Sequence, residues 1–434
     1  MRPDSDTPIP LDPSQLVVGL YVWIDLPWTD HPFLTSRRLI TSQREIALIH
    51  RSQPTGLLYY YPQRSRVQPP PAAPPPAATA ATPAATVAGP TTATEAADEV
   101  EREFQRLRED KRRRLARQHE RGARMRQGWD QAARQVRTTL QDFMRSPRSA
   151  GERLRMLGHE TALQVAGSEA LVLHMLGERL NAGAQHHALN VMMLSLLLGQ
   201  RAGLSPSELA DLGMAALAHD AGEADIPAAV LRNPRRRRFE EDFYRQHVTL
   251  GLQMALQSGQ FSPAALALIA EHHEAADGSG WPQGRRDAVR GARILAMADR
   301  FDRLCNPLAD GVAALSPAEA LARMVRHEAA RFDAALLALL VQLLGAHPPG
   351  SLVQLSDGSV AMVIGASTQA DAPRVRLHAP ELAREDAPEM DLSAQPEVRI
   401  ARVLRHDELP DTVRDWFDPA LVPAHTLRDG AAAP

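Results

Sequence analysis

Histidines and aspartates interrupt an apolar, helix-forming region at five separate places. They are His187, the pair His219-Asp220, His247, the pair His272-His273, and Asp299. The two pairs each end an apolar run, and Asp299 lies inside the apolar run 294–301. An unpaired carboxylate is costly to bury in such a place. The joint occurrence of these five elements favours metal binding over a set of unrelated structural polar residues.

Imidazole and carboxylate groups are ligands for Fe, Mn, Zn, Co or Ni. The chain has a single cysteine, Cys305, which excludes both an intrachain disulfide and a thiolate cluster. A pair of metals about 3.5–4 Å apart, held by carboxylates and imidazoles, is the arrangement that hydrolyses phosphoesters. Taken singly, each element has a simpler interpretation, such as a core histidine or an exposed helix end.

The overall composition is that of a globular protein. The 434 residues carry a formal net charge of −3, and their number predicts two or three domains. The first ten residues are polar and rich in proline, unlike a signal peptide. No apolar stretch approaches the roughly 20 residues that span a bilayer. We therefore expect a cytoplasmic protein without a membrane span.

Composition divides the chain into six segments. We expect a small N-terminal α/β or β domain at 12–64, a disordered Pro- and Ala-rich linker at 65–97, a charged helical arm at 98–148, a helical domain at 149–346, a small β appendage at 347–405 and a tail at 406–434. The predicted fold is therefore mainly α, with small β-containing parts at both ends.

Local signals predict several individual elements. Ser205 and Ser316 each precede a proline and lie three residues before a glutamate, as helix N-caps do. Asp357-Gly358 separates two alternating apolar segments and predicts a hairpin. We also expect strands over 16–24 and 57–61 and a helix over 42–50.

The helical arm is strongly basic and contains Lys111, the only lysine of the chain. A nucleic-acid or membrane patch would explain this charge. A solvated helix or coiled-coil arm explains it more simply, because no aromatic residues are interleaved for base stacking among the basic residues of 111–126. We therefore expect no nucleic-acid polymer as a partner.

Ordered motifs over residues 150–344 resemble a known family, the HD-GYP domains of the HD metal-dependent phosphohydrolases. The motifs are His187-Ala-Leu-Asn-Val, His219-Asp220-Ala221-Gly222-Glu223, Ile226-Pro227, His247 to Gly251, His272-His273-Glu274, Asp277 to Pro282, and Ala298 to Asp302. The N-terminal segment, with Val-Gly-Leu-Tyr-Val, resembles an uncharacterised domain that precedes HD-GYP domains in some proteobacterial proteins.

The resemblance implies an HD-type helical bundle that hydrolyses cyclic di-GMP to the linear dinucleotide or GMP in bacterial second-messenger signalling. It implies two divalent transition metals, Fe or Mn, with Asp220 as the bridging catalytic residue. The remaining ligands would be His187, His219 and Asp299 for one metal, and His247, His272 and His273 for the other. The substrate loop would contain Gly278, Gly280, Trp281 and Pro282.

The sequence departs from the family pattern at four places. Glu223 replaces a lysine that would contact a substrate phosphate, although this glutamate could instead reach a metal. Trp281 replaces a tyrosine, and residues 306–309 lack the family's basic Arg-Pro-Tyr-Arg element. Gly183 stands where a glutamate supports a third metal in some members, so we expect two metals at most.

Three functions stay open at this level. The first is an active cyclic di-GMP phosphodiesterase. The second is a weak or inactive domain that senses cyclic di-GMP or docks a diguanylate cyclase or another signalling protein, as the lost cations at Glu223 and 306–309 suggest. The third is a helical scaffold, which retention of all the ligand-type residues disfavours. A homodimer is compatible with each of the three.

Overall fold

The computed structural model describes residues 7–417 except 27–29, 34, 53–56, 72–89, 144, 168–185, 366, 368, 370, 381 and 406–407. Gly183, most of the expected linker and most of the expected tail lie outside the described residues. The chain divides into two compact units, residues 1–122 with 381–388 and residues 123–380 with 389–434. The six segment boundaries expected from composition stay predictions.

The first unit is built on a four-stranded antiparallel sheet with the order β1-β4-β2-β3. Its elements are β1 (Ile9–Pro10), a 3₁₀ turn η1 (Pro13–Gln15), β2 (Tyr21–Ile24), β3 (Arg37–Leu39), α1 (Gln43–Arg51) and β4 (Leu58–Tyr60). The strand expected over 16–24 begins only at Tyr21, because Gly19 adopts a φ of 101° that ends the extended backbone. The expected helix over 42–50 is confirmed, with Ser42 as its N-cap.

Helix α2 (Pro90–Phe143) is the expected charged arm, and it begins inside the segment that we expected to be linker. Phe104 of this helix packs in the apolar cluster of the first unit. Nearby, the Lys111 ammonium is buried and donates to the carbonyls of His31 and Phe33 at 3.0 and 2.9 Å. The only lysine therefore connects α2 to the loop that contains His31 and Phe33, and it does not belong to a basic surface.

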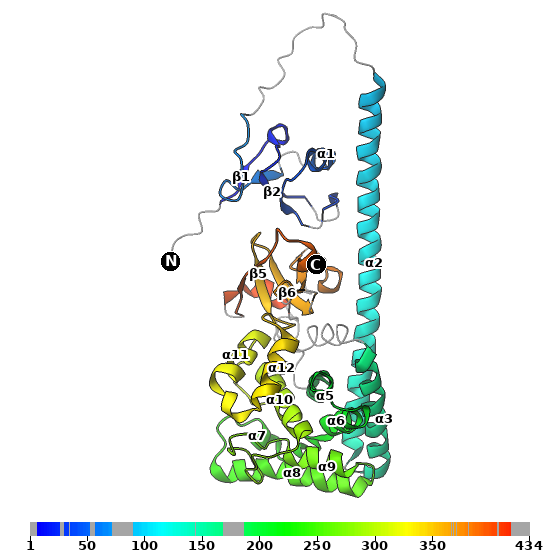
Figure 1. The fold of residues 1–434 in the computed structure, drawn as a ribbon, viewed down its shortest axis with the longest axis vertical. Coiled ribbons are helices and arrows are strands. Elements are labelled where there is room, and N and C mark those ends of the chain that lie inside the picture. The colour runs from blue at the N-terminus through cyan, green and yellow to red at the C-terminus, as the bar shows by residue number, and fades with distance from the viewer. Residues whose placement is uncertain are drawn as a thin grey trace, which may run out of the picture. The chain divides into compact units, whose positions relative to one another are not determined.

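The second unit is mainly helical (Figure 1). Its helices are α3 (Pro147–Gly167), α5 (His187–Arg201), α6 (Pro206–Ala218), η4 (Ala221–Asp225), α7 (Ala228–Leu231), α8 (Arg238–Ser258), α9 (Pro263–Glu271), α10 (Arg290–Cys305), α11 (Pro317–His327), η5 (Ala329–Arg331) and α12 (Ala334–Leu344). Of these, α3, α9, α10 and α12 each pack against α5 or α6. The predicted N-caps at Ser205 and Ser316 are confirmed, each as a capping box with a glutamate. Trp129, Val136 and Phe143 of α2 join the core of these helices.

A five-stranded antiparallel sheet follows, with the order β8-β7-β6-β5-β9. Its strands are β5 (Leu352–Leu355), β6 (Val360–Gly365), β7 (Arg374–Leu377), β8 (Glu389–Asp391) and β9 (Ile400–Val403), and η7 (Leu392–Ala394) and the helix α13 (Asp411–Phe417) belong to the same part of the chain. The short helix η6 (Arg384–Asp386), between β7 and β8 in sequence, belongs to the first unit. The hairpin predicted at Asp357-Gly358 is confirmed, since β5 and β6 pair in register on either side of it. The predicted fold class, mainly α with a small β-containing part at each end, is confirmed. None of the described helices combines the length and the apolarity that crossing a membrane requires.

Candidate metal centre and adjoining cavity

The seven histidines and aspartates expected as ligands come together in two groups that share Asp220. His187, at the start of α5, lies with His219 and Asp299 on one side of Asp220. His247 of α8 lies with His272 and His273, which follow α9, on the other side. Within each group one potential ligand atom of every residue lies within 4.8 Å of the others. We call these the α10-side group (His187, His219, Asp220, Asp299) and the α8-side group (Asp220, His247, His272, His273).

The helix backbone orients three of these imidazoles in the same way. Nδ1 of His219, of His247 and of His272 lies 2.8 Å from the carbonyl oxygen three residues earlier in its own segment. A carbonyl only accepts, so Nδ1 must carry the proton and donate. The opposite nitrogen, Nε2, is then left with its lone pair directed into the site.

His187 is oriented by a side chain instead. Its Nδ1 lies 2.6 Å from Oδ2 of Asp302, a buried carboxylate on α10. The other oxygen of Asp302 accepts from the amides of Asn190 and Asn306 at 2.7 and 3.0 Å. Sequence analysis missed this role of Asp302, although its position three residues after Asp299 on one helix was a usable signal.

Gly222 lets η4 lie directly against α8. A Cβ atom at Gly222 would lie 2.0 Å from the carbonyl oxygen of His247 and 2.6 Å from the backbone nitrogen of Gly251. No side chain fits in this space. The glycine two residues after Asp220 therefore sets the distance between the aspartate and the α8-side imidazoles.

Asp220 lies between the two groups and offers one oxygen to each. Its Oδ2 is 3.4 Å from Nε2 of both His187 and His219. Its Oδ1 is 3.5 Å from Nε2 of His247 and 3.8 Å from Nε2 of His272. A carboxylate in this position is suited to bridging two cations.

The residues present fit a pair of divalent transition metals. Five buried atoms that face one another make no hydrogen bond: Nε2 of His187, His219 and His272, and Oδ1 of Asp220 and Asp299. Polar atoms buried without a partner are rare in folded proteins and call for an explanation such as a bound ion. Nitrogen and oxygen donors of this kind suit Mn, Fe, Co, Ni or Zn, so they leave the identity of the metal open.

Two of the imidazoles are neutral, and the carboxylates of the site attract positive charge. Burial lowers the pKa of His247 to about 4 and brings that of His273 well below its usual range, so both rings are neutral. Burial would raise the pKa of Asp220, but His219 and Arg303 hold it well below its usual range. Burial would also lower the pKa of His187, yet the carboxylates of Asp220 and its neighbours raise it well above its usual value. The field that draws a proton to His187 also favours a metal ion.

A guanidinium that the sequence analysis did not single out also lies in the site. Arg303 of α10 is ion-paired with Asp220, with Glu223 at 3.0 Å, and through Nε with Asp299 at 3.6 Å. Burial would lower its pKa, but Glu223 and Asp220 raise the pKa well above its usual value, so the group is charged. Arg303 stands four residues after Asp299, on the same face of α10, and this spacing was a usable signal.

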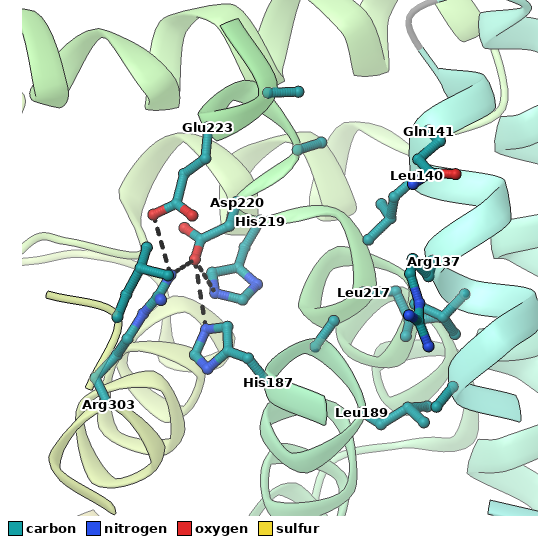
Figure 2. Close-up of a pocket in the computed structure, with 16 residues that line it drawn as sticks. Arg137, Leu140, Gln141, His187, Leu189, Leu217, His219, Asp220, Glu223 and Arg303 are labelled. Carbon is teal, nitrogen blue, oxygen red and sulfur yellow. Dashed lines mark hydrogen bonds and ion pairs between the residues drawn. The ribbon is translucent and has the colours of Figure 1, made fainter. Parts of the chain in front are cut away.

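A cavity of about 300 Å³ opens beside the α10-side group. His187, His219, Asp220, Glu223 and Arg303 form its polar end, and the last part of α2 faces them across the cavity (Figure 2). The apolar lining consists of Ala133, Val136, Leu140, Ala188, Leu189, Leu217, Ala221, Ala224 and Leu308. Arg137 and Gln141 of α2 add polar groups to this opposite wall.

The residues expected to form a substrate loop lie next to the α8-side group. The indole of Trp281 stacks on the His273 imidazole, with ring centroids 4.1 Å apart, and meets His247 edge-on at 5.3 Å. Gly280 lies against the backbone of residues 273–275. Gly278, Gly280, Trp281 and Pro282 are not part of the lining of the cavity, so their role toward a substrate stays a prediction.

Comparisons with known proteins match two parts of the chain to family models. Residues 170–336 match the HD domain, and residues 9–153 match a domain of unknown function, DUF3391. A cyclic di-GMP phosphodiesterase of Pseudomonas aeruginosa is 29% identical over 183 residues, 41% of this chain and 43% of that protein. A cyclic di-GMP phosphodiesterase of Thermotoga maritima is 34% identical over 141 residues, 31% of this chain and 37% of that protein.

A third relative has a different cyclic dinucleotide in its name. The 3'3'-cGAMP-specific phosphodiesterase 2 of Vibrio cholerae is 33% identical over 123 residues, 27% of this chain and 23% of that protein. The alignments thus span less than half of the length of each of these relatives. They agree with the resemblance that the motifs indicated: residues 170–336 match an HD domain, residues 9–153 in front of it match DUF3391, and parts of the chain are similar to cyclic-dinucleotide phosphodiesterases.

Proposed function

We propose that this chain is a metal-dependent phosphodiesterase that hydrolyses cyclic di-GMP to the linear dinucleotide or to GMP. The observation that carries the proposal is the pair of His/Asp groups that share Asp220, one of which adjoins a cavity. The names of the similar proteins support a cyclic dinucleotide as the substrate. The presence of 3'3'-cGAMP among them makes that compound the natural second substrate to test.

We assign the seven residues as ligands of two divalent cations, with Asp220 contributing to both. Cations held there would activate water and stabilise the negative charge that develops on a phosphodiester. The chain's own contribution is preorganisation. The carbonyl-bonded imidazoles and the Asp302-bonded His187 hold their donor atoms in place before any ligand binds.

The cavity walls suggest how a dinucleotide would bind. The apolar surface formed by Val136, Leu140 and Leu189 suits the faces of purine rings. Arg137, exposed on α2, offers a cation to a substrate phosphate on the side opposite Asp220. It would supply part of the positive charge that the sequence lacks at Glu223 and residues 306–309.

A second function, a sensor or docking module with little or no turnover, is favoured by one feature of the site. Glu223 places a carboxylate where the family has a phosphate-binding lysine, and Arg303 is engaged by carboxylates of the site. In this case cyclic di-GMP would bind in the cavity and remain intact. A diguanylate cyclase or another signalling protein would be the partner of such a module.

The test is a paired measurement on the purified full chain, loaded anaerobically with Mn²⁺ or Fe²⁺. Metal per chain is measured by elemental analysis, and products from cyclic di-GMP and 3'3'-cGAMP are separated by chromatography. The phosphodiesterase proposal expects two metals and a linear or mononucleotide product. Asp220→Ala should abolish both metal binding and product formation. Asp225 is an exposed neighbour in η4, and Asp225→Ala should change neither the metal content nor the products. A chain that binds metal and cyclic di-GMP but forms no product would contradict the phosphodiesterase proposal and support the sensor function.

A further inference from the structure

The two metal-binding groups differ in their relation to one side chain, Arg303. Its nitrogens contact the Asp220 carboxylate and Oδ1 of Asp299, which are the carboxylate ligands of the α10-side group. In the α8-side group the corresponding oxygen, Oδ1 of Asp220, faces imidazoles. Among the residues that the structure describes, no arginine or lysine forms an ion pair with Oδ1 of Asp220.

We propose that Arg303 is a built-in counter-cation of the α10-side group, so that this group binds its metal second and more weakly than the α8-side group. The inference rests on the metal centre of the proposed function and adds an order of filling to it. A divalent ion in the α10-side group needs the oxygens that the guanidinium now contacts. Binding there must displace Arg303, whereas binding to the α8-side imidazoles leaves it in place.

Glu223 gives the displaced guanidinium a second position. Glu223 lies on η4, and its Oε1 is already 3.0 Å from Nη2 of Arg303. Figure 2 shows the guanidinium directed at both Glu223 and Asp220. Moving away from Asp220 and Asp299 therefore leaves Arg303 paired, which avoids the large cost of a buried charge without a partner. Glu223 thus acts in favour of metal binding without being a ligand itself.

The experiment is a titration of the metal-free full chain with Mn²⁺ alone, with free Mn²⁺ followed by electron paramagnetic resonance. The wild type should bind two ions in two steps that differ by about tenfold or more in affinity. Arg303→Met should tighten the second step by about tenfold and leave the first nearly unchanged. Glu223→Gln should act in the opposite direction and weaken the second step, because Arg303 then loses its charged alternative partner.

Arg300→Met is the matched control, because Arg300 lies on the same helix but pairs with Glu328 outside both groups. It should titrate like the wild type. A role of Arg303 in folding alone predicts that both site variants lose metal, which would overturn the inference. If Arg303→Met does not fold, the variants Glu223→Gln and the charge-conserving Arg303→Lys still test whether Arg303 weakens metal binding to the α10-side group. The lysine variant should keep two unequal steps, because an ammonium still opposes a cation at the carboxylates.

The remaining outcomes separate this inference from the proposed function. Two equal steps in the wild type that Arg303→Met does not change would overturn the order of filling and leave the two-metal centre standing. A wild type that binds no Mn²⁺ would overturn both the order of filling and the two-metal centre. In either case the product assay with cyclic di-GMP gives an independent reading of the proposed activity.

Discussion

His187 and Asp302 form a buried pair in which the imidazole Nδ1 lies 2.6 Å from the carboxylate Oδ2, although 115 residues separate them along the chain. The pair joins the first turn of α5 to the last part of α10. It fixes the ring of His187 so that Nε2 faces Asp220 and Asp299. Asp302 is therefore a positioning residue for the α10-side group.

Replacing Asp302 by Asn tests this positioning. Asp302 accepts from His187 on one oxygen and from the amides of Asn190 and Asn306 on the other. An amide has a single acceptor oxygen, so one side must lose its hydrogen bond. We expect Asp302→Asn to weaken binding of the second metal by about 10- to 100-fold. Mn²⁺ titration checks this, with the exposed Asp310→Asn as the control, and an unchanged second step would contradict it.

Gly222 and Gly128 make a contrasting pair of alanine substitutions. A Cβ at Gly222 would overlap the carbonyl oxygen of His247, whereas one at Gly128 in α2 meets nothing within 4 Å. We expect Gly222→Ala to destabilise the fold by about 1–3 kcal/mol or more and to lower metal content. Gly128→Ala should stabilise it by about 0.5–1 kcal/mol, because glycine is a poor helix former. Thermal and urea unfolding measure both, and equal effects would refute the close η4–α8 contact.

Much of the fold and the site could be predicted from sequence because the signals are local. Capping boxes at Ser205 and Ser316 and the Asp357-Gly358 hairpin each need only a few adjacent residues. The ligand-type residues stood out because polar groups were placed where only apolar ones are easily buried. Both kinds of signal can be recognised in the sequence without knowing how the helices and strands pack.

The partners of these residues were not predictable in the same way. The spacing of Arg303 from Asp299 shows only that the two share a face of α10, and its pairing with Asp220 and Glu223 arises when α10 packs against the segment that contains them. Ala133, Val136 and Leu140 of the apolar cavity lining belong to α2, whose heavily charged sequence indicated a solvated arm. Such contacts depend on which faces of distant helices meet, and periodicity within a single helix does not contain that information.

The ion pairs of Glu328 with Arg300 and Arg323 should make the stability of the second unit depend on pH. Hydrogen bonds from Arg300, together with Arg323, lower the pKa of Glu328 to about 2. The unfolded chain therefore binds this proton at a higher pH than the folded chain. The stabilisation is present above about pH 4.5 and is lost as the pH falls through about 2. Glu328→Gln should lower Tm at pH 7, and its difference from the wild type should shrink between these pH values.

The control for this comparison is Glu152→Gln, since Glu152 is exposed on α3. It should follow the wild type across the whole pH range. A difference between Glu328→Gln and the wild type that persists unchanged down to pH 2 would show that the substitution acts through packing and that the ion pairs with Arg300 and Arg323 contribute nothing.

Arg137 offers the most direct test of substrate binding in the cavity. It lies on the α2 wall of the cavity, across from the polar end (Figure 2). If the proposed reaction holds, Arg137→Gln should raise KM for cyclic di-GMP about tenfold with little change in kcat. The reason is that a phosphate contact on the wall opposite the metal centre contributes to substrate binding and not to the chemical step. Arg134→Gln, exposed on the same helix and absent from the lining, should leave both constants unchanged. A loss in kcat alone, with KM unaltered, would instead place Arg137 in the chemical step and would contradict binding of the substrate against the α2 wall.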